Sequence, residues 1–248
     1  MRILGIDSAI PEASVAIIKN GEIIVEAIQG KVGQFGVHHG GHAIGNLAET
    51  LLPLIQSILD RAQSTIKDLA AIGLSIGPGS FTGLRIGLAT AKGLAYGTDL
   101  PLIGISTLHA HAARVKDFDG VIGAMLDARK GEVYVALFRR QGETLARLTA
   151  DAVLPIRTAI ELLQISQRDA ELPLLLIGDG AQAHERQLNA ALGDASRIVA
   201  GGDYASAAAQ VARLAGERVV AGSVDNLGAL APVYLRLSEA ETKRKLLS

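Results

Sequence analysis

The chain has 248 residues, of which 49% are hydrophobic and 20% charged, with a formal net charge of -1 and no cysteine. This composition supports a full hydrophobic core and excludes global disorder. The near-neutral charge argues against strong electrostatic binding to nucleic acid or an anionic membrane, although a partner could supply a basic surface. The absence of cysteine excludes disulfides, thiolate metal sites and cysteine nucleophiles, and it agrees with a reducing cytosol.

The sequence predicts neither a membrane span nor a secretory signal. No uninterrupted apolar run reaches the roughly 18 residues that a span needs. No charged-then-apolar leader precedes the first expected strand. We therefore expect a cytoplasmic protein.

The first elements in the chain predict an antiparallel meander. Short apolar runs predict strands at 3–6, 14–18 and 22–26. The Asn-Gly pair at 20–21 is a strong signal for a two-residue hairpin turn. Residues 30–45 are rich in glycine and histidine and are expected to form a loop.

A helix is expected after this loop. Apolar residues recur in steps of three and four, which predicts a helix over 44–63. Pro53 is expected to kink this helix or to break it locally. A buried strand at 71–76 then leads through a glycine-rich turn into a second helix over 83–97.

The remaining elements suggest a second block of strands and helices. After a strand at 102–105, Ser106 is expected to cap a helix that runs through Arg114. No repeat of about 20 to 50 residues is present, which excludes a solenoid. The second block is expected to contain strands at 121–126, 132–139 and 174–177, helices at 155–163, 181–192 and 206–219, and an extended segment at 230–237.

The glycine-rich turn at 77–83 is the most informative stretch. A turn that opens a helix presents free backbone N–H groups where the helix dipole favours negative charge. The pattern matches neither the P-loop nor the dinucleotide fingerprint. Either the turn binds an anion or a nucleotide phosphate, or its glycines only let the following helix pack closely. The candidate nucleotide-binding residues are Asp7, Gly77, Gly79, Ser80, Phe81, Thr82 and Gly83.

The helix over 83–97 is apolar on nearly all sides, with Arg85 and Lys92 as its only charged residues. Such a helix must be covered on more than the side that faces a sheet. The cover is another part of this chain, including the helix over 44–63, or a different subunit. For the second case the expected interface residues are Leu47, Leu51, Ile55, Ile58, Leu84, Gly87, Leu88, Ala91, Leu94 and Ala95.

Several motifs, in this order along the chain, together resemble the TsaB family. They are Ile-Leu-Gly-Ile-Asp-Ser at 3–8, the block at 77–93, Asp-Ala-Arg at 127–129 with Glu-Val-Tyr at 132–134, and Pro-Val-Tyr-Leu-Arg at 232–236. The block that begins Gly-Pro-Gly-Ser-Phe-Thr-Gly-Leu-Arg is the most specific, and TsaB shares it with its catalytic relative TsaD.

The resemblance implies an α/β fold of the actin/hexokinase-like (ribonuclease H-like) type, with two lobes of mixed sheets flanked by helices. The first lobe would span 1–104 and be completed by residues about 205–237. The second lobe would span 105–204, and 238–248 would form a tail.

The resemblance also implies a function. It implies a non-catalytic, cytoplasmic subunit that binds and activates a TsaD-like subunit, which transfers threonylcarbamoyl to the adenosine next to the anticodon of tRNA. A TsaE-like ATPase would join the same complex, the chain alone would form a homodimer, and tRNA would be contacted only indirectly. No cofactor would be required by this chain, with ATP or ADP left open at the partner interface.

No metal site is expected. TsaD-type subunits carry a metal-binding pair of histidines on the helix after the third strand, and the equivalent segment 46–55 has none. Leu47 stands where TsaB-like chains commonly keep one histidine. His38, His39 and His42 could hold a metal if their loop folded around it. A polar loop is favoured, because no Asp or Glu lies between Glu26 and Glu49 to complete the site.

The rival interpretation is an enzyme, an actin-like phosphotransferase or ATPase. It would use Asp7, the turn at 77–83 and the Gly-Asp-Gly turn at 178–180 as metal- and phosphate-binding groups. Asp7 and Gly-Asp-Gly are also ordinary turn sequences, and we favour that interpretation. No spacing assembles a Ser/His/Asp triad around Ser80 or Thr82. No catalytic residue is therefore expected.

Overall fold

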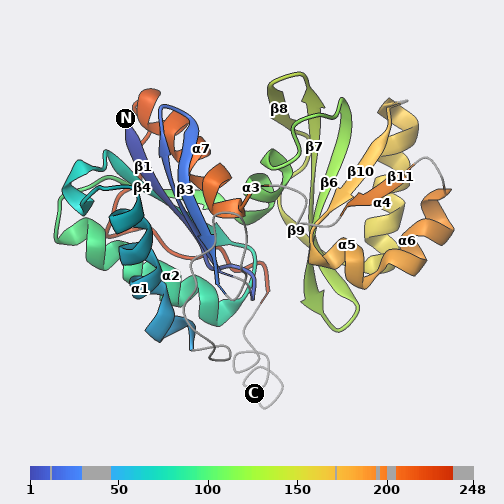
Figure 1. The fold of residues 1–248 in the computed structure, drawn as a ribbon. Coiled ribbons are helices and arrows are strands. Elements are labelled where there is room, and N and C mark those ends of the chain that lie inside the picture. Colours follow the sequence, from blue (N-terminus) through green and yellow to red (C-terminus); the bar gives the residue numbers. More distant parts are fainter. Residues whose placement is uncertain (12, 30–45, 171, 194–195, 200–204, 237–248) are drawn as a thin grey trace, which may run out of the picture. The chain divides into compact units, whose positions relative to one another are not determined.

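The computed structural model of the chain describes residues 1–11, 13–29, 46–170, 172–193, 196–199 and 205–236 (Figure 1). Contacts divide these residues into two compact units. Unit 1 comprises Met1–Ala110 and Ala205–Pro232, and unit 2 comprises the described residues of 111–199 and 233–236. The loop expected at 30–45 and the tail expected at 238–248 lie outside the described residues.

Unit 1 is built on a five-stranded sheet in the order β3-β2-β1-β4-β5. Strands β1 (Arg2–Asp7), β2 (Ser14–Lys19) and β3 (Glu22–Ile28) form the expected antiparallel meander. The turn between β2 and β3 has positive φ at both Asn20 (53°) and Gly21 (86°), the conformation that an Asn-Gly hairpin turn requires.

Strands β4 (Ala71–Gly77) and β5 (Leu102–Ser106) extend this sheet, with β4 parallel to β1 and β5 parallel to β4. The carboxyl ends of β1, β4 and β5 therefore lie along the same edge of the sheet. Asp7 and the glycine-rich turn, which end β1 and β4, come to this edge together.

Helices α1 (Leu47–Arg61) and α2 (Phe81–Tyr96) contact each other and pack on one face of the sheet. The Asn46 side chain accepts a hydrogen bond from the Ala48 N–H and caps α1. Of the two expectations for Pro53, the local break is wrong, since α1 runs through this exposed residue without interruption, and the kink stays a prediction. A 3₁₀ turn, η1 (Ile66–Asp68), leads into β4.

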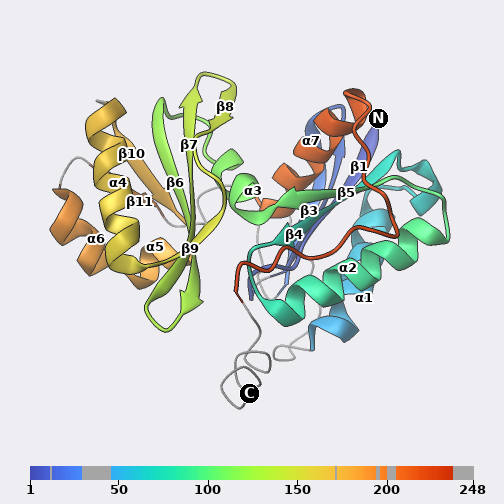
Figure 2. The same ribbon diagram turned by 180° about the vertical axis from the view of Figure 1, so that it is seen from behind.

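Helix α7 (Ala207–Val220) covers the opposite face of the sheet (Figure 2). Its approach depends on missing side chains. A Cβ atom at Gly5 would clash with the Ala208 carbonyl oxygen, and one at Gly73 would lie 2.7 Å from the Ala215 Cβ atom. Such close contact increases dispersion contacts between helix and sheet, so glycine on the strands and alanine on the helix fit together.

Helix α3 (Thr107–Ala113) follows β5, and its expected cap is confirmed. The Ser106 Oγ atom accepts a hydrogen bond from the His109 N–H at 3.2 Å. The contact boundary between the units falls within this helix, after Ala110.

Unit 2 has a six-stranded mixed sheet. The long hairpin of β6 (Gly120–Arg129) and β7 (Glu132–Gln141) is joined by β10 (Leu174–Ile177), parallel to β6, with helix α4 (Ile156–Ala170) packed against the sheet. The sequence did not predict β8 (Thr144–Arg147), β9 (Ala152–Pro155) or β11 (Ser196–Val199). These strands have only four residues each and little buried surface, so they show no clear apolar pattern. The single helix expected over 181–192 is two helices, α5 (Asp179–Ala183) and α6 (Glu185–Leu192).

The expected fold class is confirmed. Both units have mixed sheets flanked by helices, and unit 1 has the antiparallel meander followed by two parallel strands that the actin/hexokinase-like (ribonuclease H-like) arrangement requires. No helix within the described ranges is both long and apolar enough to cross a bilayer.

Candidate functional site

The glycine-rich turn joins β4 to α2, as the sequence predicted. Ser80 is the N-cap of α2, and its Oγ atom accepts a hydrogen bond from the Gly83 N–H at 3.2 Å. The Ser80 N–H donates to the Ala9 carbonyl oxygen at 2.7 Å. These two N–H groups of the turn are therefore engaged by the chain itself.

The glycines of the turn lie against the backbone that follows β1. A Cβ atom at Gly79 would clash with the Ala9 carbonyl oxygen, and one at Gly83 would clash with the Ser8 carbonyl oxygen. A Cβ atom at Gly87 would meet the Ser8 hydroxyl, which donates a hydrogen bond to the Gly83 carbonyl oxygen at 2.9 Å. This geometry supports the close-packing interpretation of the turn.

Asp7 is fully buried beside the same turn. Its Oδ1 atom accepts a hydrogen bond from the Ala9 N–H at 3.1 Å, and Ala9 in turn holds Ser80. Asp7 and the turn are therefore brought together as expected. The role of these residues in nucleotide binding stays a prediction.

The other residues of the predicted nucleotide site differ in exposure. Gly77 is buried, Thr82 is exposed, and Phe81 is partly buried. The Arg85 guanidinium lies 3.8 Å from the centroid of the Phe81 ring, a cation–π contact along the first turn of α2.

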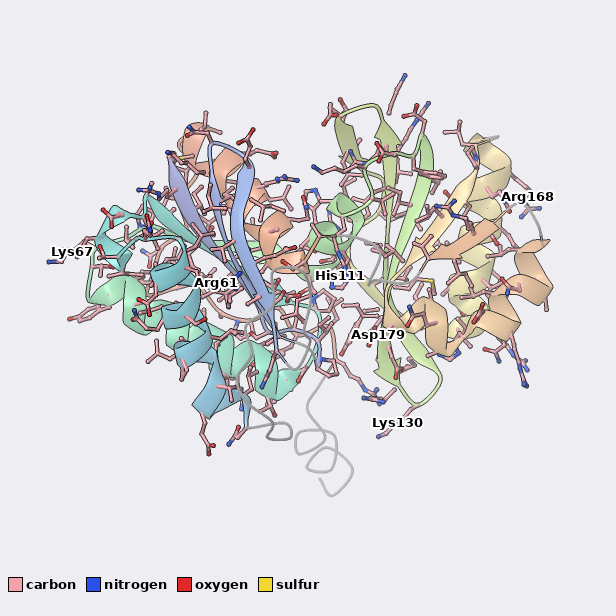
Figure 3. All side chains as sticks on the ribbon, in the orientation of Figure 1. Arg61, Lys67, His111, Lys130, Arg168 and Asp179 are labelled. Atoms are coloured by element: carbon pink, nitrogen blue, oxygen red, sulfur yellow. The ribbon has the colours of Figure 1, made fainter. Side chains whose placement is uncertain are left out.

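The Gly-Asp-Gly turn in unit 2 also packs against its neighbours. Gly178 has φ 114°, and a Cβ atom there would clash with the Met125 carbonyl oxygen. Asp179, at the start of α5 (Figure 3), accepts a hydrogen bond from the Asp127 N–H at 3.1 Å. Desolvation, with a smaller contribution from the charge of Asp127, raises the pKa of Asp179. These contacts support the ordinary turn interpretation.

Two of the family motifs meet in unit 2. The Arg236 Nη1 atom donates to the Ala128 carbonyl oxygen at 2.8 Å and lies 3.2 Å from the Glu132 Oε2 atom. Arg236 thus ties the end of the second motif to the hairpin that carries 127–134. The motif at 127–134 and the motif that ends at Arg236 therefore stabilise each other through a hydrogen bond and an ion pair.

Most of the residues expected at a partner interface are buried inside unit 1 instead. Leu51, Ile55, Ile58, Leu84, Ala91 and Ala95 are at most 1% exposed, and Gly87 is also buried. They form the core of unit 1, because α1 and α2 turn their most apolar stripes toward the sheet. Leu47, Leu88 and Leu94 are partly buried against the same core. None of the fully buried side chains is accessible to a partner.

A different set of residues lies on the sides of α1 and α2 that face away from the sheet. We call Leu52, Ala89, Gly93 and Tyr96 the outer face; the exposed fractions of Leu52 and Tyr96 are 53% and 81%. Apart from the adjoining backbone of α2 itself, no atom lies within 4 Å of a Cβ atom built at Gly93. Apolar spacing did not single out this face, because its two large side chains belong to different helices, Leu52 to α1 and Tyr96 to α2.

No group of three or more His, Asp or Glu side chains within the described ranges could hold a metal ion. The loop considered as a possible metal site, with His38, His39 and His42, lies outside the described residues. Among the described residues, His111 on α3 is a buried histidine (Figure 3), and desolvation, with the charge of Arg114, lowers its pKa to about 3.

Comparisons with known proteins agree with the motifs. Residues 34–243 match the family model described as TsaD, tRNA N6-adenosine threonylcarbamoyltransferase. The chain is 30% identical to TsaB of Bacillus subtilis over 98% of this chain and 97% of that protein. It is 38% identical to TsaB of Escherichia coli over 142 residues, 56% of each chain. The solved structure of YeaZ from Pseudomonas aeruginosa matches with a TM-score of 0.72 and 25% identity, over 94% of this chain and 99% of that one. The chain belongs to the TsaB family.

Proposed function

We propose that the chain acts in the biosynthesis of threonylcarbamoyladenosine on tRNA, as a non-catalytic subunit that binds and activates a TsaD-like subunit. Similarity to Bacillus subtilis TsaB, a protein named for this biosynthesis, over nearly the whole length of both chains supports the pathway. A cytoplasmic location fits this role.

The outer face of α1 and α2 is the observation that carries the partner role. Leu52 of α1 and Tyr96 of α2 are more than half exposed, and the exposed residues Ala89 and Gly93 of α2 are small. Small residues let a second helix approach closely, and large apolar side chains lose exposed surface on binding, at about 25 cal/mol per Å² before the cost of association. Interfaces are also enriched in Tyr. The outer face therefore suits a helical surface of the partner.

The site at Asp7 supports the non-catalytic role rather than the ATPase alternative. Its carboxylate is buried and holds the Ala9 N–H, and the turn beside it uses its glycines to pack against the chain. On this proposal no cofactor is needed, and ATP or ADP would bind at the partner interface. A TsaE-like ATPase would join the complex, tRNA would be contacted only indirectly, and the chain alone would form a homodimer through the outer face.

Substitutions on the outer face test the partner role. Gly93→Glu and Leu52→Glu place a charge on the face without entering the core, so each is expected to weaken binding to a TsaD-like subunit at least tenfold, about 1.4 kcal/mol. Titration calorimetry with the purified partner measures this. The matched control is Ile165→Glu on α4, at a residue 48% exposed in unit 2.

Three outcomes are distinguishable in this experiment. Loss of affinity in both outer-face variants, with the control unchanged, supports the proposal. Equal binding by all variants would show that the interface lies elsewhere. Failure of the unmodified chain to bind a TsaD-like subunit would overturn the proposed function itself.

The enzyme alternative has its own test. The purified chain is expected to release no phosphate from ATP above a blank, because its buried Asp7 carboxylate already holds a backbone N–H. Phosphate release by the isolated chain that disappears in Asp7→Asn would instead favour the ATPase. The measurement is a phosphate-release assay with magnesium and ATP.

A further inference from the structure

The segment that follows α7 crosses the edge of the sheet in unit 1. Strand β5 is the last strand in the order β3-β2-β1-β4-β5, and residues 223–230 run past it and alongside α2 (Figure 2). An edge strand presents unpaired N–H and C=O groups, which are a template for pairing with another chain. At β5 this template is occupied by side chains.

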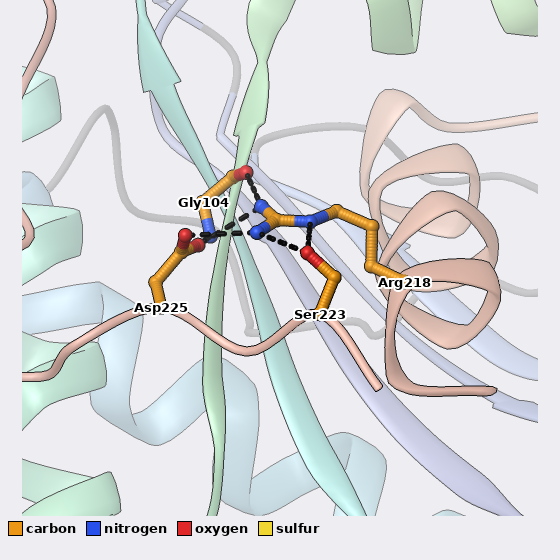
Figure 4. A network of polar contacts seen from close by, with 4 residues as sticks. All are labelled: Gly104, Arg218, Ser223 and Asp225. Carbon is orange, nitrogen blue, oxygen red and sulfur yellow. Dashed lines mark hydrogen bonds and ion pairs between the residues drawn. The ribbon is translucent and has the colours of Figure 1, made fainter. Parts of the chain in front are cut away.

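The ion pair of Arg218 and Asp225 forms hydrogen bonds with both the N–H and the carbonyl oxygen of Gly104 (Figure 4). The Gly104 N–H donates to the Asp225 Oδ2 atom at 2.7 Å, and the Gly104 carbonyl oxygen accepts from the Arg218 Nη1 atom at 2.9 Å. Arg218 and Asp225 also bind each other through two contacts, at 2.9 and 2.8 Å. The carboxylate thus takes the place of a neighbouring strand's carbonyl, and the guanidinium takes the place of its N–H.

Gly104 is the middle residue of those that face outward from β5. The Pro101 carbonyl oxygen, just before β5, accepts a hydrogen bond from the Ile72 N–H of β4 at 2.9 Å, so the backbone groups of Pro101 point toward β4. Because residues in a strand point their backbone groups alternately to either side, Leu102, Gly104 and Ser106 face away from β4. Because Asp225 and Arg218 already bind the backbone groups of Gly104, another strand cannot form a continuous ladder of hydrogen bonds with β5.

The crossing segment is held to unit 1 at further points. Leu227 and Leu230 pack against the core that α1 and α2 share, and the Lys92 ammonium donates to the Gly228 carbonyl oxygen at 3.3 Å. A Cβ atom at Gly104 would lie 2.9 Å from the Leu230 Cδ1 atom, so the glycine also makes room for this leucine. The segment is therefore held beside β5 by contacts with Gly104, Lys92 and the core of unit 1.

Apart from a register shift against β4 between Ser75 and Gly77, the strand itself has little that would deter pairing. Its five residues, Leu-Ile-Gly-Ile-Ser, include no charge and no proline. Natural edge strands are blunted by such residues, by bulges or by covering segments, and short apolar stretches of high β-propensity associate when exposed. Protection of β5 from pairing thus comes mainly from the covering segment.

We propose that Arg218 and Asp225 form an edge lock, which denies β5 to the β5 strand of a second copy of the chain. Two β5 strands paired antiparallel about Gly104 satisfy each other's outward groups by one symmetric contact, which makes a second copy the occupant once the lock opens. The edge lock includes none of the four outer-face residues and no residue of a catalytic partner.

Sedimentation velocity over a range of protein concentrations tests the lock. Asp225→Ala and Arg218→Ala each free one backbone group of Gly104. Each is expected to form species larger than the outer-face homodimer, at concentrations at least tenfold below those at which the unmodified chain forms them. Asp225→Asn keeps the side-chain shape but loses the ion pair, and it is expected to associate to a smaller extent. Ser223→Ala is the matched control, because Ser223 contacts Arg218 and not Gly104.

Hydrogen exchange separates strand pairing from general unfolding. In the associated species of Asp225→Ala, in which the Gly104 N–H has lost its acceptor within the chain, the amides of Leu102 and Gly104 are expected to be protected while the rest of the sheet keeps its protection. Unchanged sedimentation of Asp225→Ala, Arg218→Ala and Asp225→Asn would overturn the proposal. Association without protection of these two amides, or equal association by Ser223→Ala, would overturn it too.

Discussion

Gly5→Ala is expected to destabilise unit 1 by roughly 3 kcal/mol, the upper end of the usual cost of overpacking. The added methyl group would clash with the Ala208 carbonyl oxygen and lie 2.9 Å from the Ala212 Cβ atom. These atoms belong to a helix backbone and a buried alanine, so neither can move aside as a flexible side chain would. Urea unfolding followed by circular dichroism measures the change.

Gly93→Ala provides the matched control, because it makes the same chemical change where nothing lies within 4 Å of the new atom. Alanine is favoured over glycine inside a helix, so this variant is expected to be more stable by about 0.5–1 kcal/mol. The two substitutions should therefore shift the urea midpoint in opposite directions. A Gly5→Ala chain as stable as the unmodified one would show that α7 does not approach β1 so closely.

Acidification is expected to destabilise the chain through His111. The ring is buried, and desolvation, with the charge of Arg114, lowers its pKa to about 3, so it stays neutral in the folded chain. In the unfolded chain it gains a proton below about pH 6.5. Since the unfolded state then binds more protons, stability is lost as the pH falls, by about 2.5 kcal/mol between pH 6 and pH 4.

The variant His111→Leu removes this titration and keeps an apolar side chain in the same place. Its free energy of unfolding should fall less between pH 6 and pH 4 than that of the unmodified chain, by the amount assigned to His111. His184→Gln is the control, because it removes a partly exposed histidine of unit 2. The same pH dependence in His111→Leu and the unmodified chain would contradict the assignment.

The outline of the fold could be predicted because its signals are local. The Asn-Gly turn, the apolar runs of β1 to β7 and the glycine turn before α2 each need only a few neighbouring residues to be recognised. Short strands with few buried residues, such as β8 and β11, could not be predicted, because they are stabilised by pairing with a neighbouring strand and show no apolar pattern of their own.

The candidate site was predictable only in part. That Asp7 and the turn at 77–83 meet follows from the parallel arrangement of β1 and β4, whose carboxyl ends share an edge. What the glycines of the turn contact did not follow, because the backbone of Ser8 and Ala9 is brought there by the sheet.

The sequence by itself determined the family, the α/β class and the two apolar helices, because these depend on residue types and spacing along the chain. Only the tertiary structure decided which side of those helices is free. Apolar spacing marks the stripe with the most surface to bury, and the sheet of unit 1 already covers it, through Leu51, Ile55 and Ala91. The outer face and the edge lock depend on contacts between residues far apart in the chain, such as Gly104 with Arg218, which no local pattern encodes.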